Sequence, residues 1–125
     1  MNKLLELVGR ILLSLIFFTS GMSKIGGYAA TQGYMESQGV PGMLLPLVIA
    51  LEVLAPLLIA VGWQTRLAAL ALAAFSIAAA VLFHADFGNQ MQMIMFMKNI
   101  SIAGGFLLLA AHGAGEWSLD RRRAR

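Results

Sequence analysis

The sequence predicts an all-α integral membrane protein, an antiparallel four-helix transmembrane bundle formed by a single domain of 125 residues. Hydrophobic residues make up 59% of the chain and charged residues only 12%, whereas a soluble domain carries about 25% charged residues. Four apolar stretches of roughly 18–21 residues follow one another, and about 20 residues cross a bilayer core. Backbone groups in lipid must find partners within their own segment, so these spans are predicted to be helices.

The first span covers about residues 4–23. Its beginning resembles a signal peptide, but Glu6 and Arg10 interrupt the apolar sequence and no small-residue cleavage site follows. We therefore expect this helix to be retained. The following residues, 26–40, predict a short amphipathic helix at the membrane surface. Pro41 suits the start of the next helix, because the N–H that proline lacks would be unpaired there.

The other three spans cover residues 42–62, 67–84 and 93–111. A tight hairpin of residues 63–66 joins the second span to the third, and Trp63 suits a membrane interface. In the third span, the small residues Ala71, Ala74 and Ala78 are expected to let a neighbouring helix approach closely. The tail, residues 113–125, is basic, with four arginines among its last five residues.

The distribution of basic residues predicts that both termini are cytoplasmic. This orientation places seven basic residues, Lys3, Arg10, Arg66 and the four tail arginines, on or toward the cytoplasmic side, and two, Lys24 and Lys98, toward the other. Lysine and arginine accumulate on the cytoplasmic side of membrane proteins. A basic cluster directly after an apolar helix indicates topology and contact with anionic lipid rather than nucleic-acid binding.

Glu52 is the most informative residue, because it lies near the middle of the second span. A carboxylate at that depth costs roughly 2.5–3.5 kcal/mol unless a partner compensates it. Possible partners are Arg10, Lys24 and Lys98. Pro56 adds to this interest, since a proline inside a helix deprives the carbonyl four residues earlier, that of Glu52, of its hydrogen bond.

The first span carries a polar stripe that should face the bundle interior. Its members are spaced four, three, four and three residues apart and so share one helix face: Arg10, Ser14, Phe17, Gly21 and Lys24. Two interpretations stay open, a ligand site and a buried ion network that only holds the helices together. The candidate intramembrane polar site comprises Arg10, Ser14, Lys24, Glu52, Arg66, Lys98 and Asn99.

Several kinds of site are not favoured. The chain has no cysteine, which excludes disulfides and thiolate metal ligands. His84 and Asp86 are candidate metal ligands, but a third is missing, so a polar cap at the membrane interface is the preferred reading and no metal is expected. No phosphate-binding loop or nucleophile triad is present.

Taken as a set, these residues resemble the DoxX family, and within it the short YqjF-like bacterial inner-membrane proteins. The resemblance rests on Arg10, Ser20-Gly21 with Lys24, Gly39-Val40-Pro41, Glu52, Gly62 with Thr65-Arg66, Lys98-Asn99 with Gly104-Gly105, and the ending Gly113 and Ser118-Leu119-Asp120. It covers almost the whole chain and implies a four-helix protein of the bacterial inner membrane. The family takes its name from a subunit of a thiosulfate:quinone oxidoreductase, which implies a membrane redox context but no catalytic residues.

Three functions stay open from the sequence. The first is a subunit of a membrane redox system that binds a quinone or another lipophilic ligand, with its redox centre supplied by a partner protein. The second is a scaffold or anchor without a ligand of its own. The third is a small proton-coupled transporter built around Glu52, which would require a homodimer. The expected partners are the lipid bilayer and either a redox protein or a second copy, not nucleic acid; whether the protein is an enzyme stays open.

Overall fold

The computed structural model describes residues 2–84 and 86–124, and all regular structure in this part of the chain is helical. The elements are α1 (Lys3–Gly26), α2 (Tyr28–Ser37), the 3-10 helix η1 (Gly42–Leu44), α3 (Leu45–Val61), α4 (Thr65–Phe83), α5 (Gln90–His112) and α6 (Leu119–Ala124).

Four helical segments in the described residues are long and apolar enough to cross a membrane: α1, η1 with α3, α4 and α5. The four predicted spans are confirmed as helices, but some of their ends differ. Helix α1 continues to Gly26, three residues beyond its predicted end, and α4 begins at Thr65, two residues before its predicted start. Helix α5 begins at Gln90, three residues before the predicted start, because the side chain of Asn89 accepts hydrogen bonds from the backbone N–H groups of Met91 and Gln92, at 2.9 and 3.3 Å. Such a cap pairs N–H groups that a helix start leaves free.

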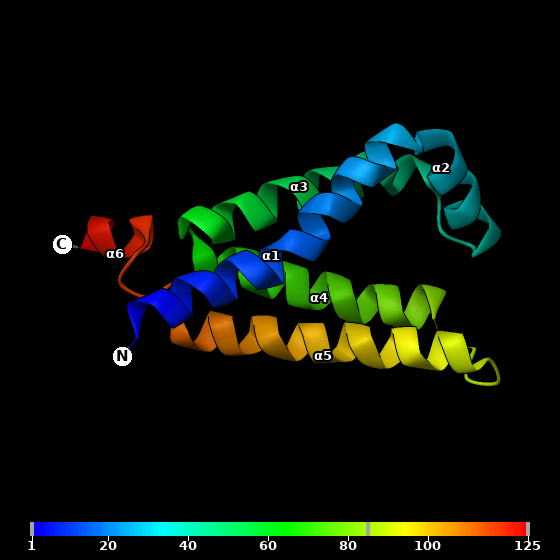
Figure 1. The fold of residues 1–125 in the computed structure, drawn as a ribbon. Coiled ribbons are helices and arrows are strands. Elements are labelled where there is room, and N and C mark those ends of the chain that lie inside the picture. The colour runs from blue at the N-terminus through cyan, green and yellow to red at the C-terminus, as the bar shows by residue number, and fades with distance from the viewer. Residues whose placement is uncertain (1, 85, 125) are drawn as a thin grey trace.

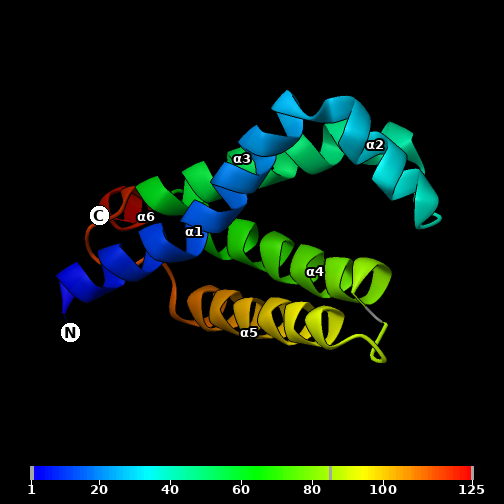
Figure 2. The same ribbon diagram turned by 45° about the vertical axis from the view of Figure 1, so that its right-hand side comes forward.

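The long helices form two antiparallel pairs (Figure 1). Helix α1 packs along α3, and α4 packs along α5. Both views show the pairs close together where α3 turns into α4 and farther apart toward α2 (Figure 2). We call the first region, with the start of α1 and with α6, the tail end, and the opposite region the α2 end. The start of α1 and the whole of α6 thus lie at the same end of the bundle. Which side of the membrane this end faces stays a prediction.

The buried core lies toward the tail end. It is built from Phe17 of α1, the second half of α3, the first half of α4 and the second half of α5: Phe17, Ala55, Ile59, Ala68, Ala69, Leu72, Ala73, Ala103 and Phe106. Phe17 contacts the rings of Phe75 and Phe106 at centroid distances of 6.2 and 5.6 Å. Because the helices are packed here and spread beyond Phe17, space inside the protein is left at the α2 end.

The prediction that Ala74 and Ala78 lie on the packing face of α4 is wrong, because the buried face is on another side of the helix. Ala74 and Ala78 are exposed, and the buried alanines are Ala68, Ala69, Ala73 and Ala80. Helix α4 turns its buried face toward both α3 and α5. An alanine spacing of three or four residues defines a stripe but not the direction in which the stripe points.

Helix α2 is the predicted short helix between the first two spans. Met35 is the one residue in it that is buried, so the helix rests on the bundle by a narrow contact. Tyr34 extends that contact by stacking on Phe83 at the end of α4, with ring centroids 5.5 Å apart. Helix α2 therefore bridges α1 and α4 across the wider end of the bundle.

Candidate functional site

The central feature of the bundle interior is an ion pair between α1 and α3. Lys24 Nζ lies 2.7 Å from Glu52 Oε1, and the Glu52 side chain is only 2% exposed while that of Lys24 is 25% exposed. The prediction that a basic residue pairs with Glu52 is confirmed, with Lys24 as the partner. Oε1 itself accepts no hydrogen bond of normal geometry within the described structure, so this contact is electrostatic and leaves acceptor capacity on the carboxylate.

A close helix crossing holds this pair in place. Gly21 faces α3 where a Cβ atom would lie 2.9 Å from Val53 Cγ2 and 3.1 Å from Glu52 Cβ. No real side chain fits at such distances, so glycine permits the approach. One turn later, Lys24 also donates to Ser20 Oγ at 2.7 Å. An ammonium has three N–H donors, so at least one stays free for a further acceptor.

The ion pair forms part of the wall of a cavity of about 400 Å³ at the α2 end. Aromatic and aliphatic side chains make most of the remaining wall, contributed by all four spans and α2: Ile16, Phe17, Tyr34, Met35, Val40, Leu44, Val48, Phe75, Leu82, Phe83 and Ile102. Small-molecule sites have volumes of about 300–1,000 Å³ and combine apolar walls with a few polar groups. The cavity has these properties.

Further polar side chains line the same cavity. Asn99 reaches it from α5, and His84 reaches it from the end of α4. His84 Nδ1 lies 2.9 Å from Gln92 Oε1, in the first turn of α5. Of the candidate site residues, the structure therefore brings together Lys24, Glu52 and Asn99, and it adds His84, which the sequence indicated only as a metal candidate.

Arg10 lies elsewhere, and its prediction as a partner of Glu52 is wrong. It is 2% exposed and donates to the backbone carbonyl of Ile59 at 3.2 Å and to that of Trp117. The carbonyl of Ile59 belongs to the last turn of α3, where the negative end of the helix dipole favours a cation. Ser14, one turn further along α1, is buried with an unpaired hydroxyl and does not line the cavity. Arg10 therefore connects the tail to the bundle.

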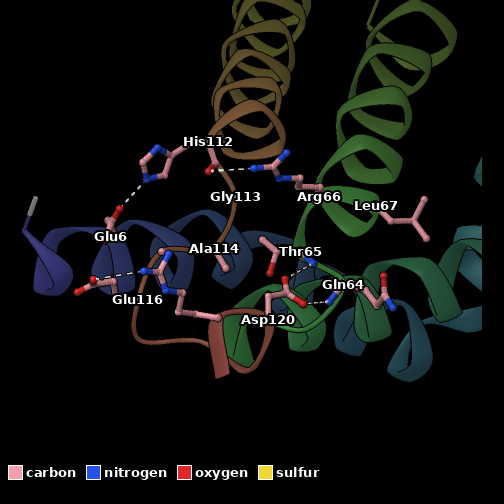
Figure 3. Close-up of a pocket in the computed structure, with 12 residues that line it drawn as sticks. Glu6, Gln64, Thr65, Arg66, Leu67, His112, Gly113, Ala114, Glu116 and Asp120 are labelled. Atoms are coloured by element: carbon pink, nitrogen blue, oxygen red, sulfur yellow. Dashed lines mark hydrogen bonds and ion pairs between the residues drawn. The ribbon is translucent and has the colours of Figure 1, made fainter. Parts of the chain in front are cut away.

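The tail is fixed by a second contact, made by Asp120. Its carboxylate accepts from the backbone N–H groups of Gln64 and Thr65, at 2.8 and 2.9 Å, and so caps the start of α4 (Figure 3). Partial burial acts to raise the pKa of Asp120, but these hydrogen bonds and the charge of Arg10 outweigh it and hold the pKa below its usual value. The ionised form of Asp120 is therefore the one that stabilises the fold.

The tail end also has an open polar basin of about 620 Å³ beside these contacts. Figure 3 shows acidic side chains paired with His112 and Arg121 beside it. His112 Nε2 lies 2.5 Å from Glu6 Oε2, and Arg121 approaches Glu116 at 3.9 Å. Arg66, a candidate site residue, is exposed here and donates to the carbonyl of His112 at 3.4 Å. Arg66 therefore belongs to the basin and not to the intramembrane cavity.

Lys98 is also separated from the predicted cluster. It is exposed on α5 and does not line the cavity. Among the described residues it forms no ion pair, so its prediction as a partner of Glu52 is wrong. The described residues contain no group of three metal-ligating side chains, and His84 contacts Gln92 rather than Asp86.

Sequence reasoning missed the aromatic wall of the cavity and the role of Gln92. Tyr34 and Phe83 are far apart in the chain, and nothing in their sequence context indicates that they stack. Gln92 lies eight residues after His84, across a loop, and only the packing of α4 against α5 brings the two together. The capping role of Asp120 gave one weak signal, an acidic residue directly before the run of tail arginines.

These features define a class: a small all-α integral membrane protein of four spans, with an ion pair buried beside an apolar cavity. The chain belongs to the DoxX family, whose model matches residues 5–85. It is 53% identical over 115 residues to the inner membrane protein YqjF of Escherichia coli strain K12, covering 92% of this chain and 88% of that protein. It is also 42% identical to the inner membrane protein YphA of the same strain, covering 97% and 91% of the two chains. No solved structure matches the chain.

Proposed function

We propose that this protein resides in the bacterial inner membrane and binds a lipophilic ligand with polar oxygens, such as a quinone, as a subunit of a membrane redox system. The location follows the names of the two relatives. The observation that carries the ligand proposal is the placement of the Lys24–Glu52 pair in the wall of an otherwise apolar cavity of about 400 Å³.

The chemistry of the cavity fits such a ligand. An isoprenoid or alkyl chain would pack against the aromatic and aliphatic wall, while Lys24 would donate to a carbonyl or hydroxyl oxygen of the head group. Glu52 would keep Lys24 charged and in position. Because the chain has no cysteine, it has no ligands for a cysteine-bound iron–sulfur cluster. A partner protein would therefore supply the electron-transfer centre.

Quinone titration of the purified protein tests this function. Wild type should bind a short-chain quinone, and Lys24→Met should bind it about tenfold or more weakly, since a hydrogen bond to a charged group contributes about 1.5–3 kcal/mol. Ala79→Phe should also weaken binding, because Ala79 lines the cavity and a ring there would fill it without changing a charge. Lys98→Met is the control, since Lys98 lies outside the cavity.

A second function, an anchoring subunit without a ligand, is favoured by one observation. Helix α5 is the least buried of the four spans and exposes Lys98 and Ser101, which leaves a surface for a partner helix. If wild type binds no quinone, or if Lys24→Met and Ala79→Phe bind it as tightly as wild type does, the anchoring function should replace ligand binding.

A further inference from the structure

Two hydroxyl groups of the cavity wall can act only as acceptors toward a ligand, because their protons are already engaged elsewhere. Thr31 donates its hydroxyl proton to the carbonyl of Gly27 at 3.0 Å. Ser76, which is 1% exposed, donates to the carbonyl of Leu72 at 2.8 Å. Both side chains line the cavity, and each oxygen retains a lone pair after its proton is used.

His84 adds an acceptor at the α2 end of the cavity. The amide oxygen of Gln92 can only accept a hydrogen bond, so this contact selects the His84 tautomer that carries its proton on Nδ1. In a neutral imidazole with its proton on Nδ1, the other nitrogen, Nε2, accepts. Gln92 does not line the cavity whereas His84 does, so Nε2 is the ring nitrogen left for a ligand.

Donors and acceptors both face the cavity. Lys24 retains at least one N–H, and the hydroxyl groups of Ser20 and Tyr34, which also line the cavity, can donate. Glu52 brings a carboxylate that accepts only. Asn99 carries both a donor and an acceptor in its amide and can adapt to either kind of ligand. A ligand that carries only acceptor oxygens could pair with these donors but would leave Nε2 of His84 without a donor, and an unpaired buried polar group is costly.

We infer that the cavity selects ligands with a hydroxyl donor, so that a lipophilic phenol or hydroquinone binds more tightly than the corresponding quinone or ether. His84 acts as the residue that determines this specificity, and Gln92 positions it by fixing the proton on Nδ1. This inference rests on the proposed function, because it concerns the same cavity, and it narrows the class of ligand.

The test compares three ligands with the same tail: decylhydroquinone held reduced under anaerobic conditions, the corresponding decylbenzoquinone, and the dimethyl ether of the hydroquinone. Each is titrated into the purified full-length protein in detergent. Wild type should bind the hydroquinone about tenfold more tightly than either of the others, as expected for one further hydrogen bond in a dry site. The ether lacks hydroxyl donors but is bulkier than the hydroquinone. The quinone also lacks these donors without the added bulk, so it shows whether bulk alone weakens binding.

Two substitutions of one residue separate the role of His84 from general disruption. Gln92→Glu still accepts from Nδ1–H and should keep the preference for the hydroquinone. Gln92→Lys would instead donate to Nδ1 and place the ring proton on Nε2, so the preference should fall toward equal binding. His84→Phe should abolish the preference, because it removes Nε2, whereas Lys98→Met, at an exposed residue outside the cavity, should keep it.

The outcomes distinguish this inference from the function on which it rests. Binding of all three ligands with equal affinity, or tighter binding of the quinone, would overturn the selection for hydroxyl groups and leave the lipophilic-ligand function standing. The same ratio in Gln92→Glu and Gln92→Lys would overturn the role of His84. Failure to bind any of the three ligands would overturn the proposed function itself.

Discussion

Removing either member of the Lys24–Glu52 pair should destabilise the bundle, but by unequal amounts. Lys24→Met leaves the Glu52 carboxylate, which is 2% exposed, without its countercharge. Glu52→Gln leaves an ammonium on a side chain that is 25% exposed and that lies in the last turn of α1, where it can extend toward the membrane surface. The carboxylate has no such route to water.

The magnitudes follow from this asymmetry. Stranding one charge of a buried pair costs about 3–5 kcal/mol, and this range applies to Lys24→Met. For Glu52→Gln, the loss should be about 1–2 kcal/mol, since the remaining charge is hydrated and the amide oxygen still accepts a hydrogen bond. The double variant, which strands no charge, should be more stable than Lys24→Met alone.

The assay is reversible unfolding in mixed micelles followed by far-ultraviolet circular dichroism, with the four proteins of the cycle compared at one pH and one lipid composition. Lys98→Met serves as the matched control, because it removes an exposed basic residue outside the cavity and should leave stability unchanged. Equal losses in the two single variants, combined with a double variant that shows their simple sum, would refute the reasoning.

Four further predictions follow. Gly21→Ala should cost about 1–3 kcal/mol through overpacking against α3, whereas Gly9→Ala, with open space around it, should be neutral in the same unfolding assay. Arg10→Met should cost about 1–3 kcal/mol, because it removes a charged donor from the carbonyls of Ile59 and Trp117. Recovery by Arg10→Lys should be partial, and full stability of Arg10→Met would contradict the tail contact. Asp120→Ala should cost about 0.5–2 kcal/mol at neutral pH as a lost helix cap. The folded-state pKa of Asp120 is lowered, so its contribution to stability is complete above the unfolded-state pKa, near pH 4, and disappears as the pH falls through the folded-state pKa. A stability difference between wild type and Asp120→Ala that persists at strongly acidic pH would contradict this capping role. A single cysteine introduced by Ala124→Cys should resist an impermeant thiol reagent added to intact cells, and labelling from outside would reverse the topology.

The spans were predictable because hydropathy and length alone determine them in a bilayer. The ends of the spans were less predictable. The cap formed by the Asn89 side chain lets α5 begin before the apolar sequence does. Which face of a helix is buried depends on how many neighbours it has. The stripe on α1 was predicted correctly because α1 packs mainly on one partner, α3, whereas α4 lies between two.

The sequence predicted how deep each charged residue of the candidate site lies in the membrane, but not toward which helix its side chain points. The rise of 1.5 Å per residue gives the position of a charge along a helix, and on this basis Arg10 and Lys98 flanked Glu52. The arrangement of the helices decides which charges meet. Helix α5 packs mainly against α4 in this bundle, and Lys98 is exposed on it. Arg10 donates to backbone carbonyls instead of contacting Glu52, and sequence patterns do not reveal such contacts.

The contacts of Arg10 also set an order for biogenesis. Arg10 lies in the first helix, but one of its acceptors, the carbonyl of Trp117, lies 107 residues later and follows all four spans. Until Trp117 has been synthesised, the first span holds a cation without its full set of partners, and α1, α3 and the tail cannot close around Gly62. A variant truncated before Trp117 would therefore lack one acceptor for a buried guanidinium.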